Sequence, residues 1–256
     1  MAPKTSREQY IREVFGVEMR FQHQGKPYVF TPFPSPEEPY LTGVVSRESS
    51  VVVGGPPEDK YAASIISDWE TANVLIDPTG GNDGQKVAMQ AVTVIGQPVA
   101  IFRSLTDFIN QAFSDSDWSI SLNPITTKEE FWTIAGLYKD HIRELDLTFV
   151  TPNIWGGESE TEKALKKLKK DNNAQEVEVR LKNKDGKINP DSADVRQSVD
   201  YISRGGGSMK MKGEDGSVIY NSDHEENVVK ETVSPDGPIP TAEVGLIKLI
   251  IDQIFK

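Results

Sequence analysis

The sequence predicts an α+β protein with an antiparallel N-terminal sheet followed by a mixed α/β C-terminal part. Three observations support this prediction. Short runs of alternating apolar and polar residues, separated by Gly, Pro and Asn, fill residues 1–95, and such runs are typical of antiparallel strands. After Pro98, apolar residues recur at helical spacing. From Glu144 to Lys212, strand-like and helix-like segments alternate.

The length of the chain bounds its organisation. A chain of 256 residues is long enough for one large domain or two ordinary ones. The composition changes between Asn123 and Lys128, where a strand-rich half gives way to a mixed half. We therefore expect one domain over residues 1–125 and another over residues 126–256.

The composition excludes several classes of protein. Hydrophobic residues make up 37% and charged residues 26% of the chain, as in globular proteins. No apolar run approaches the roughly 20 residues that span a bilayer, and the N-terminus lacks the apolar core of a signal peptide. The chain has no cysteine, which excludes disulfides, thiolate catalysis and cysteine-ligated metals. We expect a cytoplasmic protein without a membrane partner or a cofactor.

The first elements are a helix and two hairpins. Apolar residues on one side of Ser6–Phe15 predict an amphipathic helix. Alternation over Val17–Phe21 and Tyr28–Phe30 predicts a hairpin. A second hairpin is expected from Tyr40–Val45 and Ser50–Val53, because the polar run between them resembles a turn.

The rest of the N-terminal half contains one ambiguous segment. Asp59–Thr71 fits a helix as well as a bent strand, whereas Asn73–Asp77 and Lys86–Val94 alternate as strands. Pro98–Phe113 has a wide apolar face and a proline suited to a first helical turn. Trp118–Leu122 alternates as a further strand.

The C-terminal half begins with a capping box, Thr127-Lys-Glu-Glu130, that predicts a helix start. A strand over Leu145–Val150 leads to a lysine-rich helix opened by Ser159, with Ala164, Leu165 and Leu168 facing inward. The remaining expected elements are a strand Val177–Leu181, a helix Ser192–Arg204, a meander of Met209–Lys212, Val218–Tyr220 and Val228–Thr232, and an apolar final helix from Thr241.

Charge is distributed unevenly along the chain. The net charge is −11, which argues against nucleic acid, but residues 163–213 carry 13 Lys and Arg against 7 Asp and Glu. This segment is therefore +6 within a background of −17, which indicates an anionic partner or docking between oppositely charged faces. A solvated helix surface is the alternative, since lysines near a helix C-terminus also complement its dipole.

A glycine run lies beside part of this positive charge. Gly205 alone suffices to stop a helix, so the next two glycines allow a backbone or a phosphate to approach closely. The candidate residues for binding nucleic acid or a protein partner are Lys163, Lys166, Lys167, Lys170, Arg204, Gly206, Lys210 and Lys212.

No catalytic motif is recognisable. The loop at residues 77–86 lacks the Gly-Lys-Ser/Thr of a phosphate-binding loop, the three histidines are isolated, and no Gly-x-Ser-x-Gly elbow occurs. The best candidate for a metal-dependent nuclease is a group of acidic residues with one lysine on neighbouring strands. Its members are Asp146, Glu176, Glu178 and Lys182.

The C-terminal half has a recognisable order of elements. Leu145-Asp-Leu-Thr-Phe-Val-Thr-Pro-Asn153 is followed by an amphipathic helix, by Asp185-Gly-Lys-Ile-Asn-Pro190, by the glycine run and by Asp215-Gly216. In this it resembles poorly characterised bacterial proteins found among mobile elements and anti-phage defence genes. The resemblance implies a bacterial or phage context and a role in a defence complex, but it assigns no catalytic residue.

Three functions are compatible with these observations. The leading hypothesis is a non-catalytic binding subunit that contacts nucleic acid or an acidic partner through the basic helix and the glycine-rich turn. The second is a metal-dependent nuclease or other hydrolase. The third is a structural assembly protein, held in an oligomer or complex by the final apolar helix.

Overall fold

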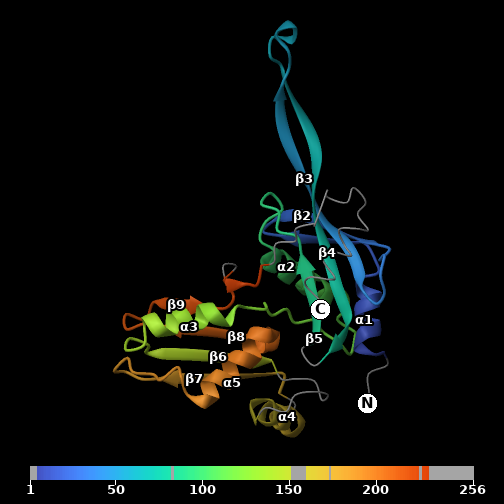
Figure 1. The fold of residues 1–256 in the computed structure, drawn as a ribbon. Coiled ribbons are helices and arrows are strands. Elements are labelled where there is room, and N and C mark those ends of the chain that lie inside the picture. Colours follow the sequence, from blue (N-terminus) through green and yellow to red (C-terminus); the bar gives the residue numbers. More distant parts are fainter. Residues whose placement is uncertain (1–4, 82–83, 151–159, 173, 225–226, 231–256) are drawn as a thin grey trace. The chain divides into compact units, whose positions relative to one another are not determined.

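The computed structural model describes residues 5–81, 84–150, 160–172, 174–224 and 227–230. They confirm the α+β class, with helices and two antiparallel sheets (Figure 1). The described residues fall into two compact units: residues 5–80 with 85–122 form unit 1, and those between 123 and 230 form most of unit 2. That residues 1–125 and 126–256 are separate domains stays a prediction.

Unit 1 contains a five-stranded sheet in the order β1-β2-β3-β4-β5. The pairs β1–β2, β2–β3 and β3–β4 are antiparallel. Its described elements are α1 (Arg7–Val14), β1 (Met19–His23), β2 (Lys26–Phe33), β3 (Leu41–Gly54), a short 3₁₀ turn (Pro57–Asp59), β4 (Ala63–Gly81), β5 (Gly84–Met89) and α2 (Pro98–Ala112).

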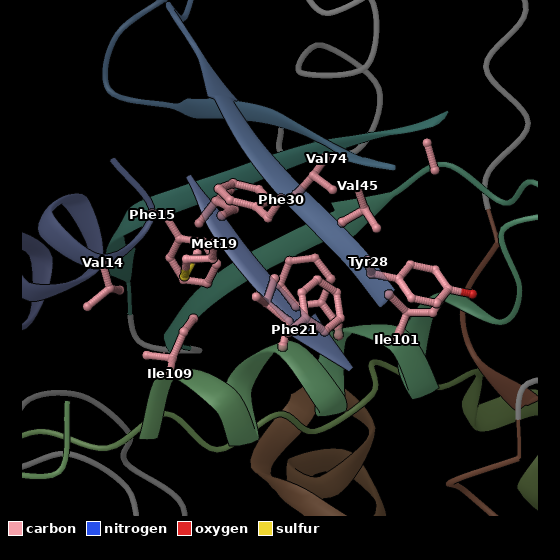
Figure 2. Packing of buried hydrophobic residues seen from close by; sticks show 14 of the residues in the cluster. Val14, Phe15, Met19, Phe21, Tyr28, Phe30, Val45, Val74, Ile101 and Ile109 are labelled. Carbon is pink, nitrogen blue, oxygen red and sulfur yellow. The ribbon is translucent and has the colours of Figure 1, made fainter. Parts of the chain in front are cut away.

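The core of unit 1 lies between the sheet and its two helices (Figure 2). Alternate residues of β1, Met19 and Phe21, point to this side and are buried beside Phe30 of β2. The helix α2 contributes Ile101 and Ile109, both fully buried. The alternate residues of the strands and the apolar face of α2 therefore pack together in a single core, as the sequence pattern predicts.

The expected second hairpin is wrong. β3 runs without interruption from Leu41 to Gly54, and Ser46–Ser49 pair with Asp68–Thr71 of β4. Residues 46–49 form a strand because β4 supplies the partners for their backbone hydrogen bonds. The ambiguous segment is accordingly strand from Ala63, and the β3–β4 ribbon projects beyond the other strands of unit 1 (Figure 1).

The expected strand at Trp118–Leu122 is also wrong. Its backbone does not join a ladder but bonds to the side chain of Asn110 on α2. Asn110 Oδ1 accepts from the amide of Ile120 at 2.8 Å, and Asn110 Nδ2 donates to the carbonyl of Ile120 at 2.8 Å. One amide side chain thus replaces a strand partner.

Unit 2 contains an antiparallel four-stranded sheet in the order β7-β6-β8-β9. Its described elements are α3 (Lys128–Leu137), β6 (Glu144–Val150), α4 (Glu160–Asn172), β7 (Glu176–Lys182), α5 (Ala193–Tyr201), a π-helical turn (Ile202–Gly206), β8 (Gly207–Lys212) and β9 (Val218–Asn221).

Helices cover one face of this sheet. The odd-numbered residues of β6, Leu145, Leu147 and Phe149, are buried against apolar side chains that include Phe131 of α3 and Leu165 of α4. The even-numbered residues of β6 point to the opposite face, which is polar. The strict alternation in the sequence reflects this two-layer arrangement.

The N-caps of α5 and α3 differ. Ser192 caps α5, since its Oγ accepts from the amide of Val195 at 3.3 Å. Thr127 is the N-cap of α3, but its side chain makes no capping hydrogen bond, so the expected capping box is not formed. The expected strand at Val228–Thr232 is reduced, over its described part, to one bridge between Val228 and Thr126.

Other expectations fall outside the described residues. These include Ser159 at the start of the lysine-rich helix and the final helix from Thr241. Within the described part of the chain, every helix is too short or too polar to cross a membrane.

Candidate functional site

The polar face of the unit 2 sheet brings together charged residues that are distant in sequence. The register places Glu144 between Lys182 of β7 and Lys212 of β8, and Asp146 between Arg180 and Lys210. Glu144 and Asp146 are mostly covered, with side chains 15% and 13% exposed. An acidic central strand is thus flanked by basic residues on both sides.

These residues form a connected ion-pair network. Glu144 Oε2 lies 2.8 Å from Lys182 Nζ, and its other oxygen bonds Lys212. Asp146 lies 2.7 Å from Arg180 Nε and 3.2 Å from Lys212 Nζ. Hydrogen bonds from Lys182 and then Lys212 lower the pKa of Glu144 to about 2. Hydrogen bonds to Glu144 and then to Asp146 raise the pKa of Lys212. Glu144 and Lys212 therefore both stay charged at neutral pH.

The network includes three of the four residues expected for a metal-dependent nuclease, Asp146, Glu178 and Lys182, but in an arrangement that does not favour metal binding. Arg180 lies between Asp146 and Glu178, with an Nη2–Oε1 distance of 2.6 Å to Glu178. Lys182 is paired with Glu144, and Glu176 lies at the far end of β7. No group of three or more His, Asp or Glu side chains among the described residues is placed to hold a metal ion.

The lysine-rich helix α4 lies on the other side of the sheet. Leu165 is buried in the core, whereas Ala164 and Leu168, which were expected to face inward, are exposed. Lys167 and Lys170 are exposed, and Lys163, Lys166 and Lys169 interact with other groups of the chain. Leu165 anchors the helix in the core of unit 2, and the lysines of the helix make its outer surface basic.

The candidate residues Arg204 and Gly206 belong to the turn after α5. Arg204 Nη2 lies 3.1 Å from Asp200, which also binds Lys128. These two cations, Lys128 first, lower the pKa of Asp200. Arg204 is therefore part of a local ion-pair cluster that ties the turn to α3.

The glycine run has a structural reason at each position. Gly205 has φ +91°, which favours glycine. A Cβ on Gly206 would lie 2.4 Å from the ring of Tyr201, and one on Gly207 would lie 1.9 Å from the carbonyl oxygen of Thr148. The close approach expected from the sequence is present, and it is made by a side chain and a neighbouring strand of this chain.

The candidate binding residues are divided between two faces. Lys163, Lys166, Lys167 and Lys170 lie on the helix layer, whereas Lys210 and Lys212 alternate with the buried Met209 and Met211 and point to the opposite face. Lys212 is neutralised there by Glu144 and Asp146. The positive charge of residues 163–213 is therefore not gathered on a single surface.

Sequence reasoning missed a hollow on the helix layer of unit 2. Arg196 of α5 lies 5.2 Å from the ring centre of Trp132 on α3 and 3.1 Å from Asp191. Lys139 and Gly136 also line the hollow, whose volume is about 300 Å³. The residues come from segments separated by some fifty positions and carry no common motif, so the sequence gives no signal for it.

Comparison with known families identifies the chain. A family model described as "Domain of unknown function (DUF4747)" matches residues 95–247, more than half of the chain. The chain belongs to this family. No curated protein and no solved structure matches it.

The DUF4747 match agrees with the expectation of a poorly characterised family. It begins at Ile95, just before α2, and takes in all the described strands and helices of unit 2. The basic helix α4, the ion-pair network and the hollow at Trp132 lie within it. The β3–β4 ribbon lies outside the matched residues.

Proposed function

We propose that this DUF4747 protein is a non-catalytic binding subunit whose helix α4 contacts the phosphate backbone of a nucleic acid. The observation that carries the proposal is the charge of α4. Residues 163–170 hold five lysines and no acidic residue. The helix packs on the sheet through Leu165, so that Lys167 and Lys170 are exposed to solvent.

The kind of cation favours a nucleic acid over a protein partner. Lysine is depleted in the cores of protein interfaces, where aromatic residues, Met and Arg are enriched. Among the residues of α4 whose burial is described, the exposed ones are Lys163, Ala164, Lys167, Leu168, Lys170, Asp171 and Asn172, and none of them is aromatic or an arginine. Ammonium groups act as point charges and suit phosphates without reading sequence. We therefore expect binding that depends on salt and little on base sequence.

The acidic residues of the polar face support a binding role rather than catalysis. The carboxylates of Glu144 and Asp146 each contact at least two cations, and a carboxylate held in this way is a poor general base. The network stabilises the sheet that carries α4. This supports binding as the function of unit 2.

The biological setting belongs to the same proposal. The resemblance to proteins encoded among mobile elements and anti-phage defence genes suggests a cytoplasmic component of a bacterial defence complex. A nucleic-acid-binding subunit is a natural part of such a complex, because the invading genome is its target. Loss of protection against phage on deletion of the gene from its host is the corresponding test.

The binding proposal is tested by fluorescence anisotropy with a labelled single-stranded DNA and a duplex of the same length. The variant Lys167→Glu/Lys170→Glu removes two cations from α4. We expect a large loss of affinity at low salt. Each lost phosphate contact should also make the negative slope of log affinity against log salt shallower by about 0.7 for single strands.

A matched control is available in the same unit. Lys184 and Lys187 are exposed and follow β7 at the end of the sheet opposite to Glu176. Lys184→Glu/Lys187→Glu changes the net charge of the chain by the same amount as the α4 variant. Equal losses from both pairs, or no binding of the wild-type protein to either DNA, would contradict the proposal. If the protein bound an acidic peptide but not DNA, the ligand of α4 would be an acidic protein rather than a nucleic acid.

A further inference from the structure

Beyond Ser46, the described residues of the β3–β4 ribbon pair only with each other. The pairing of β2 with β3 ends at the Val29–Ser46 pair, whereas β3 and β4 continue together to the Gly54–Ala63 pair. Side chains along this extension are exposed: Ile65 is 73%, Val52 66% and Trp69 53% exposed. An isolated two-stranded ribbon is marginally stable in water. We therefore expect another surface to cover this apolar extension.

The two faces of the ribbon differ in charge. Residues paired across an antiparallel ladder share a face, and the faces alternate along the strand. The face that continues from the buried Val45 carries Arg47, Asp68 and Glu70, and nearer the tip of the ribbon it carries Val53 and Ile66. The opposite face carries the pairs Val52–Ile65, Ser50–Ser67 and Glu48–Trp69, here called the outer stripe. Glu48 is its one charged residue.

The order of residues in the outer stripe is self-complementary. A pair of small residues, Ser50 and Ser67, lies between Val52–Ile65 on one side and Trp69 on the other. A two-fold axis through the serine pair places Trp69 of one copy on Val52 and Ile65 of the other. The same residues then make the contact twice, as a two-fold interface requires.

We propose that the outer stripe of the β3–β4 ribbon pairs with the outer stripe of a second copy of this chain. Charge supports this occupant over others. Residues 47–70 hold five acidic and two basic residues, a net charge of −3, which disfavours nucleic acids and anionic lipids. Two outer stripes meet with only Glu48 charged on each, and Glu48 lies opposite an apolar pair rather than its own copy.

The size of the stripe sets the strength of the pairing. Strands rise about 3.4 Å per residue and lie about 4.8 Å apart, so the stripe, from the Glu48–Trp69 pair to the Val52–Ile65 pair, is about 14 Å long and about 10 Å wide. This is smaller than the roughly 800 Å² per partner of a standard stable interface. We therefore expect a reversible dimer whose population rises with concentration. The inference is independent of nucleic-acid binding by α4.

Sedimentation velocity of the full chain over a range of concentrations tests the pairing. Ile65→Lys places a charge in the outer stripe and should leave the protein monomeric. Ile66→Lys is the matched control, because the neighbouring isoleucine is 52% exposed on the other face of the same ribbon. We expect this variant to dimerise as the wild type does. A wild type that is monomeric throughout, or equal effects of both variants, overturns the proposal.

Crosslinking tests the geometry separately. The chain has no cysteine, so Ser67→Cys and Asp68→Cys each introduce a single thiol. Ser67 lies at the proposed axis and Asp68 on the opposite face. A short bis-maleimide should join two copies of Ser67→Cys and not of Asp68→Cys. Equal crosslinking of both, or crosslinking of Asp68→Cys alone, overturns the face-to-face arrangement.

Discussion

Glu144 and Lys182 face each other directly across β6 and β7, and Glu144 Oε2 lies 2.8 Å from Lys182 Nζ. With Lys212 on the other neighbouring strand, Glu144 joins three strands through one carboxylate. The described helices of unit 2 pack on the opposite face of the sheet, and these ion pairs hold its polar face together.

Glu144→Gln should lower the stability of unit 2 at neutral pH, because it removes the charge that Lys182 and Lys212 neutralise. The folded pKa of Glu144 is about 2, below its ordinary value of 4.5. The carboxylate therefore contributes stability above pH 4.5, and this contribution is lost as the pH falls toward 2. Urea unfolding of both proteins should show a difference at pH 7 that shrinks below pH 4.5. A difference that is constant with pH would contradict this explanation.

Gly207→Ala should be strongly destabilising. The new Cβ would lie 1.9 Å from the carbonyl oxygen of Thr148, so β8 must move away from β6. We expect a loss of about 3 kcal/mol, as for severe overpacking. Gly216→Ala is the control, since Gly216 has φ +80° but no atom within 4 Å of the added carbon. It should cost about 1 kcal/mol through backbone strain alone. Equal losses in urea unfolding would show that the close approach is unimportant.

Leu147→Ala should destabilise unit 2 without affecting unit 1. Leu147 is 2% exposed in a core formed by unit 2 residues, and truncation of a buried leucine costs about 2–5 kcal/mol. Hydrogen exchange followed by mass spectrometry should show faster exchange in β6 and β8. Exchange in β1 and β2, whose core is separate, should be unchanged. Faster exchange in both units would indicate that they unfold together.

The stability of unit 1 should depend on pH through His23. Burial lowers the pKa of His23, which lies 2.8 Å from Ser104 Oγ. The folded state thus favours the neutral ring, and stability is lost as the pH falls below the ordinary value of 6.5. NMR titration of the ring protons should give a pKa below 6.5. His23→Phe should reduce the loss of stability between pH 8 and 5. An unchanged pH dependence would show that another group is responsible.

Local sequence patterns predicted the helices and strands that are determined by neighbouring residues of the chain. Alternation located β6, and Ser192 and Pro98 mark the starts of α5 and α2. The continuity of β3 could not be predicted, because the run around Arg47 becomes strand only through its partner β4.

The candidate site shows the same limit. The basic residues were visible in the sequence, but their division between two faces follows from the register of β8 and the packing of α4. Glu144 was not a candidate, since its partners Lys182 and Lys212 are far along the chain. The contact of Arg196 with Trp132 likewise requires α3 and α5 to be neighbours.

Lysine footprinting of the wild-type protein with and without single-stranded DNA shows directly whether α4 contacts the nucleic acid. Acetylation at each lysine is quantified by mass spectrometry at low salt. We expect that DNA protects Lys167 and Lys170, that added salt removes the protection, and that Lys184 and Lys187 react equally in both samples. Protection of Lys184 and Lys187 without protection of Lys167 and Lys170 would contradict it.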